Sequence, residues 1–158
     1  MTALDVREVP WDHPDAAQLR AEMAAEVGPR YADREADMAR TKANAVAPDT
    51  VARTFVVYAA GEPVGHAAVR WNGDDLELKR MFVRPAARGT GVSQEILYAA
   101  ENSARDAGLP RIILQTGDRQ PDAVRLYEKS GYTRIPIFPP YESMPFSNCF
   151  EKIFDASE

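Results

Sequence analysis

A glycine-rich segment at residues 88–93, with the sequence RGTGVS, has the residue types that bind a pyrophosphate. It opens a helical pattern, and a helix N-terminus exposes about four backbone N–H groups and roughly half a positive charge. Gly89 and Gly91 let the backbone approach a bulky anion because no side chain intervenes. Ser93 is small enough to keep that approach open, and Arg88 adds a charged donor. The segment therefore predicts an anion site.

Two other phosphate-binding motifs do not fit this segment. The P-loop sequence GxxxxGK[ST] is absent from the chain. The dinucleotide fingerprint GxGxxG begins at Gly89 and Gly91, but Gln94 stands in place of its third glycine and no acidic ribose partner is evident. A tight strand-to-helix turn, in which the glycines serve geometry alone, stays open as the alternative.

Together with a second segment, this turn resembles the GCN5-related N-acetyltransferase (GNAT) family. Residues 88–93 are similar to its motif Q/R-x-x-G-x-G/A, with serine where the last glycine or alanine is usual. Residues 123–132, AVRLYEKSGY, resemble the signature A-x-x-L-Y-E-K-x-G-F/Y almost completely, at the usual separation. The resemblance covers roughly residues 50–155. It implies an α/β domain with a mixed, mostly antiparallel, splayed sheet of six or seven strands, about four helices, and acetyl-CoA as cosubstrate.

The resemblance also implies roles for particular residues. Tyr127 would lie near the CoA sulfur and protonate the departing thiolate, which suits a phenol with a pKa of about 10. An ordinary packing role is the alternative for this ring. Gln120 stands where the family often has an asparagine that contacts the cofactor arm. The backbone groups expected to hold the pantetheine arm and the pyrophosphate are those of Met81, Phe82, Val83, Gly89, Thr90, Gly91, Val92 and Ser93.

The acceptor amine must lose a proton before it attacks, because an alkyl amine is mostly protonated at neutral pH. In protein-acetylating relatives a glutamate on the preceding strand is the base, and the similar position here is Glu77. A solvent-facing charge is the alternative for that residue. Glu142, Tyr141 and Tyr31 are further candidates for the wall of an amine pocket. The resemblance implies direct attack on the thioester in a ternary complex, so Cys149 is assigned to the core.

Periodicity predicts the elements that position these residues. We expect strands at residues 3–8, 54–59, 64–71, 76–83, 112–116, 132–138 and 148–154. Helices are expected over 14–36 with a break at Gly28-Pro29, over 34–45, from the glycine turn to about 108, and over 121–129. Alternation gives the strand at 76–83 two faces, one with Leu76, Leu78 and Phe82 and the other with Glu77, Lys79 and Met81.

The loop at residues 135–145 is rich in proline and aromatic residues. Its prolines stiffen it, and Phe138, Tyr141 and Met144 are placed to line a cleft. A dimer contact or a simple strand connection is the alternative.

Length and charge limit the remaining possibilities. The 158 residues suit one domain, residues 1–158. The net charge of −5 disfavours non-specific nucleic-acid binding, and neither a signal peptide nor a run of about 20 apolar residues is found. One cysteine and two histidines predict no disulfide and no metal site. We expect a cytoplasmic, metal-free protein without nucleic-acid or membrane partners.

The sequence thus predicts transfer of an acetyl group from acetyl-CoA to a primary amine, carried on a small molecule. One alternative is a protein lysine or N-terminal acetyltransferase. Another is a non-catalytic acyl-CoA-binding or sensing module on the same fold. Homodimers are common in the family, so a homodimer is left open.

Overall fold

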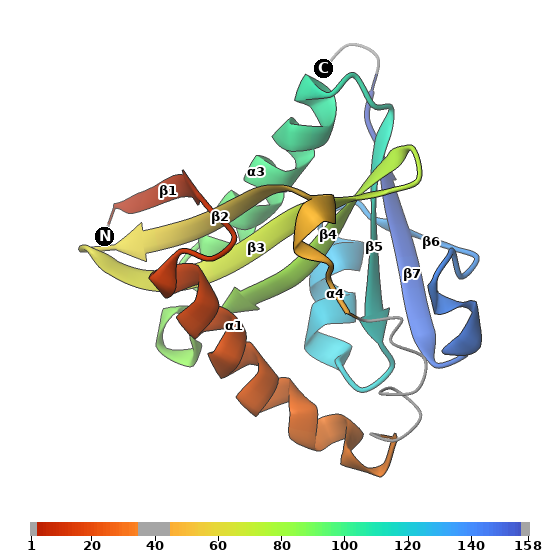
Figure 1. Ribbon diagram of the computed structural model, residues 1–158, viewed down its shortest axis with the longest axis horizontal. Helices are drawn as coiled ribbons and strands as arrows, with labels where there is room; N and C mark the ends of the chain where they lie inside the picture. Colours follow the sequence, from red (N-terminus) through yellow and green to blue (C-terminus); the bar gives the residue numbers. More distant parts are fainter. Residues whose placement is uncertain (1–2, 35–44, 156–158) are drawn as a thin grey trace.

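The computed structural model describes residues 3–34 and 45–155, which form one open sheet with helices on both faces (Figure 1). The strand order is β1-β2-β3-β4-β5-β7-β6, and β4 and β5 are the parallel pair among antiparallel neighbours. The strands are β1 (Leu4–Val9), β2 (Val51–Ala59), β3 (Glu62–Asn72), β4 (Asp75–Val83), β5 (Arg111–Gly117), β6 (Thr133–Ile135) and β7 (Ser147–Ile153).

Three α-helices and four short 3₁₀ segments lie in this described part of the chain. None of these helices is long and apolar enough to cross a membrane. The α-helices are α1 (Pro14–Val27), α3 (Val92–Asp106) and α4 (Pro121–Lys129), and the 3₁₀ segments are η1 (Gly28–Arg34), η2 (Pro48–Thr50), η3 (Pro85–Ala87) and η4 (Tyr141–Ser143).

The predicted mixed, mostly antiparallel sheet is confirmed, with seven strands. The predicted break at Gly28-Pro29 is also confirmed, because α1 ends at Val27 and η1 follows. The helix expected over residues 34–45 lies almost wholly outside the described residues. The strand expected over 132–138 is shorter, since β6 stops at Ile135 before Pro136, which has no N–H to donate to a neighbouring strand.

β4 and β5 pair over two positions only, with Glu77 opposite Ile113 and Leu78 opposite Leu114. Both strands then continue without pairing to each other, and Figure 1 shows them diverging with α4 between their ends. An unpaired strand edge offers backbone N–H and C=O groups to another extended chain. The sheet therefore has the splay that the resemblance implied, at residues 81–83 of β4.

A β-bulge at Arg80 interrupts β4 just beyond that pairing. Arg80 has a φ of +56°, which is uncommon for a residue other than glycine. The register passes from Ala68 opposite Lys79 to His66 opposite Phe82, so β4 contains one residue more than β3 over this stretch. The bulge turns the remainder of β4 over relative to the two faces of the sheet.

His66 holds this bulge from the neighbouring strand. Burial, aided by the charges of Arg20 and Arg80, lowers the pKa of His66 to about 4, so its imidazole is neutral at pH 7. The guanidinium of Arg20 can only donate, so it donates to Nε2 at 3.0 Å. Nδ1 therefore bears the proton and donates to the Arg80 carbonyl oxygen at 2.9 Å. The bond anchors the backbone of the bulge to β3.

The prediction that Phe82 shares a face with Leu76 and Leu78 is wrong. Phe82 packs on the α1 side of the sheet, in a cluster with Ala16, Leu19, Val56 and Tyr58. Met81, expected on that side, packs instead against the cluster beneath α3. The extra residue at Arg80 reverses the alternation of every side chain that follows it.

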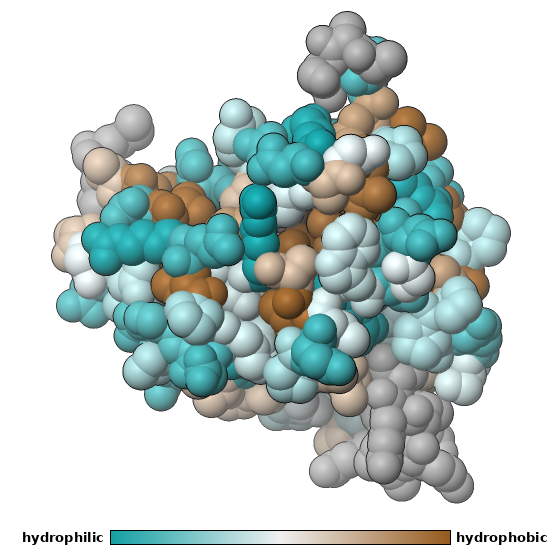
Figure 2. All heavy atoms as spheres, turned by 45° about the horizontal axis from the view of Figure 1, so that its top comes forward, coloured by the Kyte–Doolittle hydropathy of each residue, from teal (hydrophilic) through white to brown (hydrophobic). Residues whose placement is uncertain are grey.

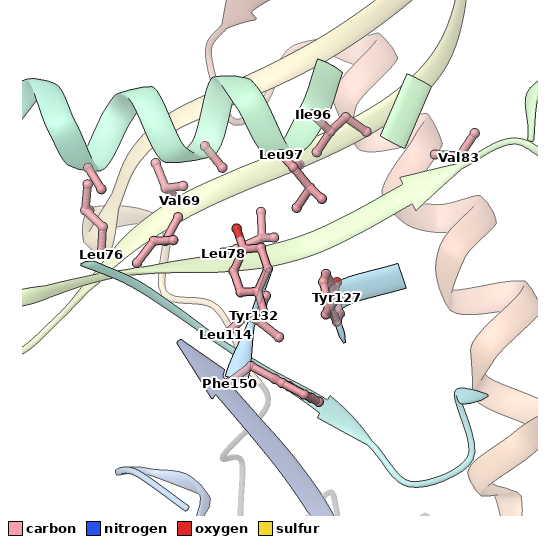
Figure 3. Close-up of a cluster of buried hydrophobic side chains, with 14 of the residues drawn as sticks. Val69, Leu76, Leu78, Val83, Ile96, Leu97, Leu114, Tyr127, Tyr132 and Phe150 are labelled. Atoms are coloured by element: carbon pink, nitrogen blue, oxygen red, sulfur yellow. The ribbon is translucent and has the colours of Figure 1, made fainter. Parts of the chain in front are cut away.

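The larger core lies between α3 and the sheet. Figure 3 shows Ile96 and Leu97 of α3 directed at the sheet, where they meet residues of β3, β4 and β5. On the face seen in Figure 2, hydrophobic side chains reach the surface only in small separate patches. The buried residues labelled in Figure 3 are Val69, Leu76, Leu78, Val83, Ile96, Leu97, Leu114, Tyr127, Tyr132 and Phe150.

β3 approaches the start of α3 closely at Gly65. A Cβ added to Gly65 would lie 2.6 Å from Cγ1 of Val92 and 3.1 Å from Cδ1 of Ile96. Val92 is the first residue of α3, so this contact positions the N-terminus of the helix that follows the glycine turn.

Gly65→Ala is expected to destabilise the protein by about 1–3 kcal/mol, because the added methyl overpacks the α3 interface. Urea unfolding of both proteins measures the difference. Gly28→Ala is the control, since a Cβ there meets nothing within 4 Å and the φ of −50° is helical. Equal unfolding free energies for Gly65→Ala and the wild type would show that α3 does not pack this closely on β3.

Candidate active site

A cavity of about 760 Å³ opens where β4 and β5 separate. A second hollow of about 270 Å³ runs along β4 toward the glycine turn, reaching Arg88 and Ser93. The two share part of their lining, so they form one continuous cleft. The shared residues are Met23, Val27, Met81, Gln120, Ala123 and Tyr127.

The glycine turn has the geometry of an anion site. Gly89 and Gly91 have φ values of +79° and +95°, a region that favours glycine. Gly91 is the N-cap of α3, and no side chain caps the helix there. The first N–H groups of α3 are thus left to an outside acceptor, and a Cβ at Gly89 would meet nothing within 4 Å. The turn therefore fits an anionic group such as a pyrophosphate.

Arg88 is held on the α1 side of this turn. Its Nη2 donates to both carboxylate oxygens of Glu26, at 2.7 and 2.8 Å, and its Nε donates to the carbonyl oxygen of Val83 at 3.0 Å. The side chain still lines the second hollow. A contact between Arg88 and a phosphate stays a prediction, and it would compete with Glu26.

Tyr127 stands at the junction of the two hollows. It comes from α4 and lies between β4 and β5 in Figure 3, with 7% of its surface exposed. Its hydroxyl lies 3.7 Å from Sδ of Met81, and its ring packs against Tyr132 and Phe150. Burial raises the pKa of Tyr127, so the phenol keeps its proton at neutral pH. The side chain can therefore act as a proton donor inside the cleft.

Gln120 and Tyr31 close the wall beside α4. Gln120 is the N-cap of α4, lines both hollows, and lies with Nε2 3.5 Å from the Tyr31 hydroxyl. Tyr31 accepts a hydrogen bond from the N–H of Arg119 and lines the cavity. Its ring covers Gly117, where a Cβ would lie 2.0 Å from the Tyr31 hydroxyl. Tyr31 is thus a wall residue, as the sequence suggested.

Glu77 is fully buried and does not line the cavity. Its Oε1 accepts from Nε of Arg70 at 3.0 Å and from Nδ2 of Asn72 at 3.1 Å. Its Oε2 accepts from the hydroxyl of Tyr141 at 2.6 Å. Glu77 is therefore not a solvent-facing charge, and it does not reach the cavity where it could contact an acceptor directly. The role of Glu77 as a base stays a prediction. A proton from an acceptor could reach Glu77 only through its neighbours Tyr141 and Lys79.

Lys79 connects that buried group to the cavity. Its Nζ donates to the Tyr141 hydroxyl at 2.8 Å and lies 4.0 Å from Oε2 of Glu77. The side chain is 3% exposed and lines the cavity. Burial lowers the pKa of Lys79 to about 7, with Arg80 and Arg70 lowering it and Glu77 opposing them.

Several other cavity residues carried no sequence signal. Arg20 of α1 and Arg80 of β4 line it, and the sequence patterns gave no reason to place either there. Of the proline-rich loop, Met144 lines the cavity as predicted, together with Phe146. Phe138 and Tyr141 instead pack in a small cluster of their own with Ile137, Met144 and Phe146. Glu142 is exposed and Cys149 is buried in β7.

A model of the acetyltransferase (GNAT) family matches residues 14–132 of the chain. The chain belongs to this family. As a GNAT protein it is an acyl-CoA-dependent N-acetyltransferase. Among its described residues, no group of three or more His, Cys, Asp or Glu side chains is arranged to hold a metal ion.

Relatives and solved structures agree with this membership. An IAA acetyltransferase of Azospirillum brasilense is 38% identical over 102 residues, which cover 63% of this GNAT chain and 67% of that protein. A Klebsiella pneumoniae structure assigned to the acyl-CoA N-acyltransferases has a TM-score of 0.77 at 25% identity, covering 96% and 98% of the two chains. The PaiA N-acetyltransferase of Thermoplasma acidophilum, solved with coenzyme A, has a TM-score of 0.68 at 14% identity over 96% and 99%.

Matches to curated relatives are partial. The first three span between 51% and 67% of the relatives' own lengths. The names of these relatives therefore do not carry over to the acceptor of this GNAT protein, whose binding place is its own cleft.

The stability of Lys79→Met relative to the wild type is expected to be highest at or below pH 7 and to fall as the pH approaches 10.5. The unfolded lysine has its ordinary pKa, so the unfolded chain binds more protons than the folded one between these values, and burying Lys79 costs most at or below pH 7. Urea unfolding across this pH range measures the difference.

Lys129→Met, at an exposed lysine in the last turn of α4, is the matched control for that measurement. Its stability difference from the wild type should not follow the same pH trend. A Lys79→Met difference that is constant across the range would show that Lys79 is not depressed in the fold.

Proposed function

We propose that the protein acetylates a primary amine carried by a small molecule, by direct attack of the amine on acetyl-CoA. The observation that supports this most is the continuous cleft, in which a hollow from the glycine turn meets a larger cavity at Met81 and Tyr127. A thioester and an amine that enter from the two ends would meet beside Tyr127. The cavity volume of about 760 Å³ suits a small acceptor.

The cofactor end would be held mainly by backbone groups. Residues 81–83 lie on β4 beyond its pairing with β5, and their backbone would hydrogen-bond an extended pantetheine arm. The backbone N–H groups of residues 89–93, in the glycine turn and at the start of α3, would hold the pyrophosphate, with Arg88 as an additional donor. Gln120 lines the same groove and would contact the arm with its amide.

Tyr127 would give its proton to the departing thiolate. Its hydroxyl lies in the cleft, and its raised pKa keeps the proton available until negative charge develops on the sulfur. The acceptor would lie beyond it, between η1, β5 and the loop that bears Met144 and Phe146. Glu77 belongs to the proposed machinery as a group behind this cavity, acting through Tyr141 and Lys79.

The small-molecule assignment also agrees with the names of several relatives. One is an IAA acetyltransferase, and a structure of lower identity is described as a streptothricin acetyltransferase with acetyl-CoA. The cytoplasmic location, the lack of nucleic-acid and membrane partners, and the homodimer stay predictions.

The proposal is tested by CoA release from acetyl-CoA in the presence of tryptamine, spermidine, glucosamine or an acetylatable lysine peptide. Faster release with any of the first three supports a small-molecule acceptor. Faster release with the peptide alone favours a protein lysine acetyltransferase. Binding of acetyl-CoA without release, over a wide amine panel, would favour the sensing module.

Gly91→Glu is expected to weaken acetyl-CoA binding by about tenfold or more, because its carboxylate faces the phosphates and its φ of +95° strains any side chain. Calorimetric titration measures the dissociation constant, with ADP as a second ligand. Gly73→Glu is the matched control, since it adds the same charge at a φ of +61° in the β3–β4 turn. Equal affinity of both variants would contradict the phosphate site.

Tyr127→Phe is expected to lower kcat by about 10²-fold while leaving acetyl-CoA affinity unchanged, because only the proton donor is removed. Steady-state CoA release with the best amine of the panel measures this effect. Tyr98→Phe, at an exposed tyrosine of α3, is the control and should keep full activity. Full turnover by Tyr127→Phe would show that the thiolate leaves without help from this phenol.

A further inference from the structure

We propose, on the basis of the acetyltransferase function above, that Lys79 is the group that takes the proton from the acceptor's ammonium. Tyr141 and Glu77 are positioning residues that hold the Lys79 amine at the cavity wall. The sequence assigned no role to this lysine, and the family resemblance pointed to Glu77 instead.

Lys79 lies at the acceptor end of the cleft, just before the bulge in β4. Four successive residues, 78–81, line the cavity, although a regular strand would turn every second side chain away. The extra residue at Arg80 turns Met81 to the α3 side of the sheet, whereas Lys79 stays on the other side. Both line the cavity because it opens at the edge of β4 that does not pair with β5. The Met81 sulfur contacts the hydroxyl of Tyr127, beside which the thioester is expected. Lys79 therefore lines the same cavity as the two residues expected nearest the thioester.

The hydrogen bonds fix the direction of each proton in this network. Tyr141 has one hydroxyl proton, and the 2.6 Å bond to Glu77 uses it. The Tyr141 oxygen must then accept from Lys79 at 2.8 Å and from Nη2 of Arg70 at 2.9 Å. Lys79 is therefore the donor toward Tyr141, and a neutral amine keeps its lone pair in addition to that bond.

Glu77 is poorly placed to take the proton itself. Both of its oxygens already accept hydrogen bonds, from Arg70, Asn72 and Tyr141. It does not line the cavity, so an acceptor could reach it only through Tyr141 and Lys79. Its charge, beside Arg70, instead compensates the cations that surround it.

The charged groups around Lys79 keep its amine able to exchange a proton near neutral pH. Glu77 and Arg80 face it from β4, Arg70 from β3 and the Tyr141 hydroxyl from η4, while Arg20 lines the same cavity from α1. Burial and the two neighbouring arginines lower the pKa of Lys79 to about 7, against the opposing charge of Glu77. Above that pH the amine is mostly neutral and can act as a base.

The proton balance of the step is complete. Nζ of Lys79 takes one proton from the acceptor's ammonium, and the freed lone pair forms the N–C bond to the acyl carbon. The C–S bond breaks, and the sulfur keeps the electron pair. Tyr127 gives its proton to that sulfur. The resulting phenolate then takes the proton that the acceptor nitrogen must lose to become an amide. Lys79 releases its proton to solvent when the products leave.

The first test is an NMR titration of isotope-labelled lysine Cε resonances, in a sequence with only four lysines. The resonance missing from Lys79→Met is that of Lys79, and its midpoint is expected at about 7. A midpoint above about 9, close to the ordinary lysine value, would overturn the proposal. This readout needs no acceptor, so it is independent of the proposed function.

The second test is the pH dependence of kcat/KM with the best amine of the panel. Lys79→Met is expected to lose about 10²-fold at neutral pH, and to lose little with hydroxylamine, which is already uncharged there. Lys129→Met, at an exposed lysine of α4, is the control and should match the wild type. A profile unchanged by Lys79→Met would overturn the proposal.

Glu77→Gln distinguishes the two candidate bases. If Lys79 is the base, the rise in kcat/KM persists and moves to lower pH, because removing the charge of Glu77 lowers the pKa of Lys79. If Glu77 is the base, that rise disappears. Failure of the wild type to bind acetyl-CoA would refute the function as a whole, whereas normal turnover with an ordinary Lys79 titration would refute this inference alone.

Discussion

The limited pairing of β4 with β5 is the constraint on which the rest of the structure depends. Two parallel positions join the halves of the sheet, and beyond them the strands diverge around α4. An unpaired edge inside a sheet would ordinarily leave backbone groups without partners, which is unfavourable unless a ligand supplies them. The same divergence makes room for the cavity and brings Tyr127 between the strands. The fold and the proposed cofactor site thus depend on one break in the sheet.

The bulge at Arg80 gives the two ends of this cleft different chemistry. Before it, β4 directs Glu77 and Lys79 away from the α3 core into a buried polar network with Arg70 and Tyr141. After it, Met81 joins the apolar core under α3 and Phe82 packs against α1. The cofactor end is therefore mostly backbone and apolar surface, whereas the acceptor end is bordered by ionisable side chains. A buried network of this kind stays favourable only while every member is satisfied.

Local sequence signals predicted most of the elements and the glycine turn, and they failed where contacts with other strands decide the local conformation. Gly89 and Gly91 predict a turn with positive φ, because residues other than glycine rarely adopt positive φ. Arg80 adopts the same region without such a signal, since His66 and the β3 register hold it there. The misplacement of Phe82 follows from that single residue. Lys79 was overlooked for the same reason, as nothing in its immediate sequence shows that it faces a cavity and Tyr141.

The most direct test of the central claim is amide chemical-shift mapping during a titration with acetyl-CoA. If the separated strand and the glycine turn hold the cofactor, the largest changes will fall on residues 81–83 of β4 and 89–93 at the start of α3, with smaller changes on α4 around Tyr127. Changes confined to other surfaces, or a saturated complex that leaves residues 81–83 unperturbed, would contradict the account.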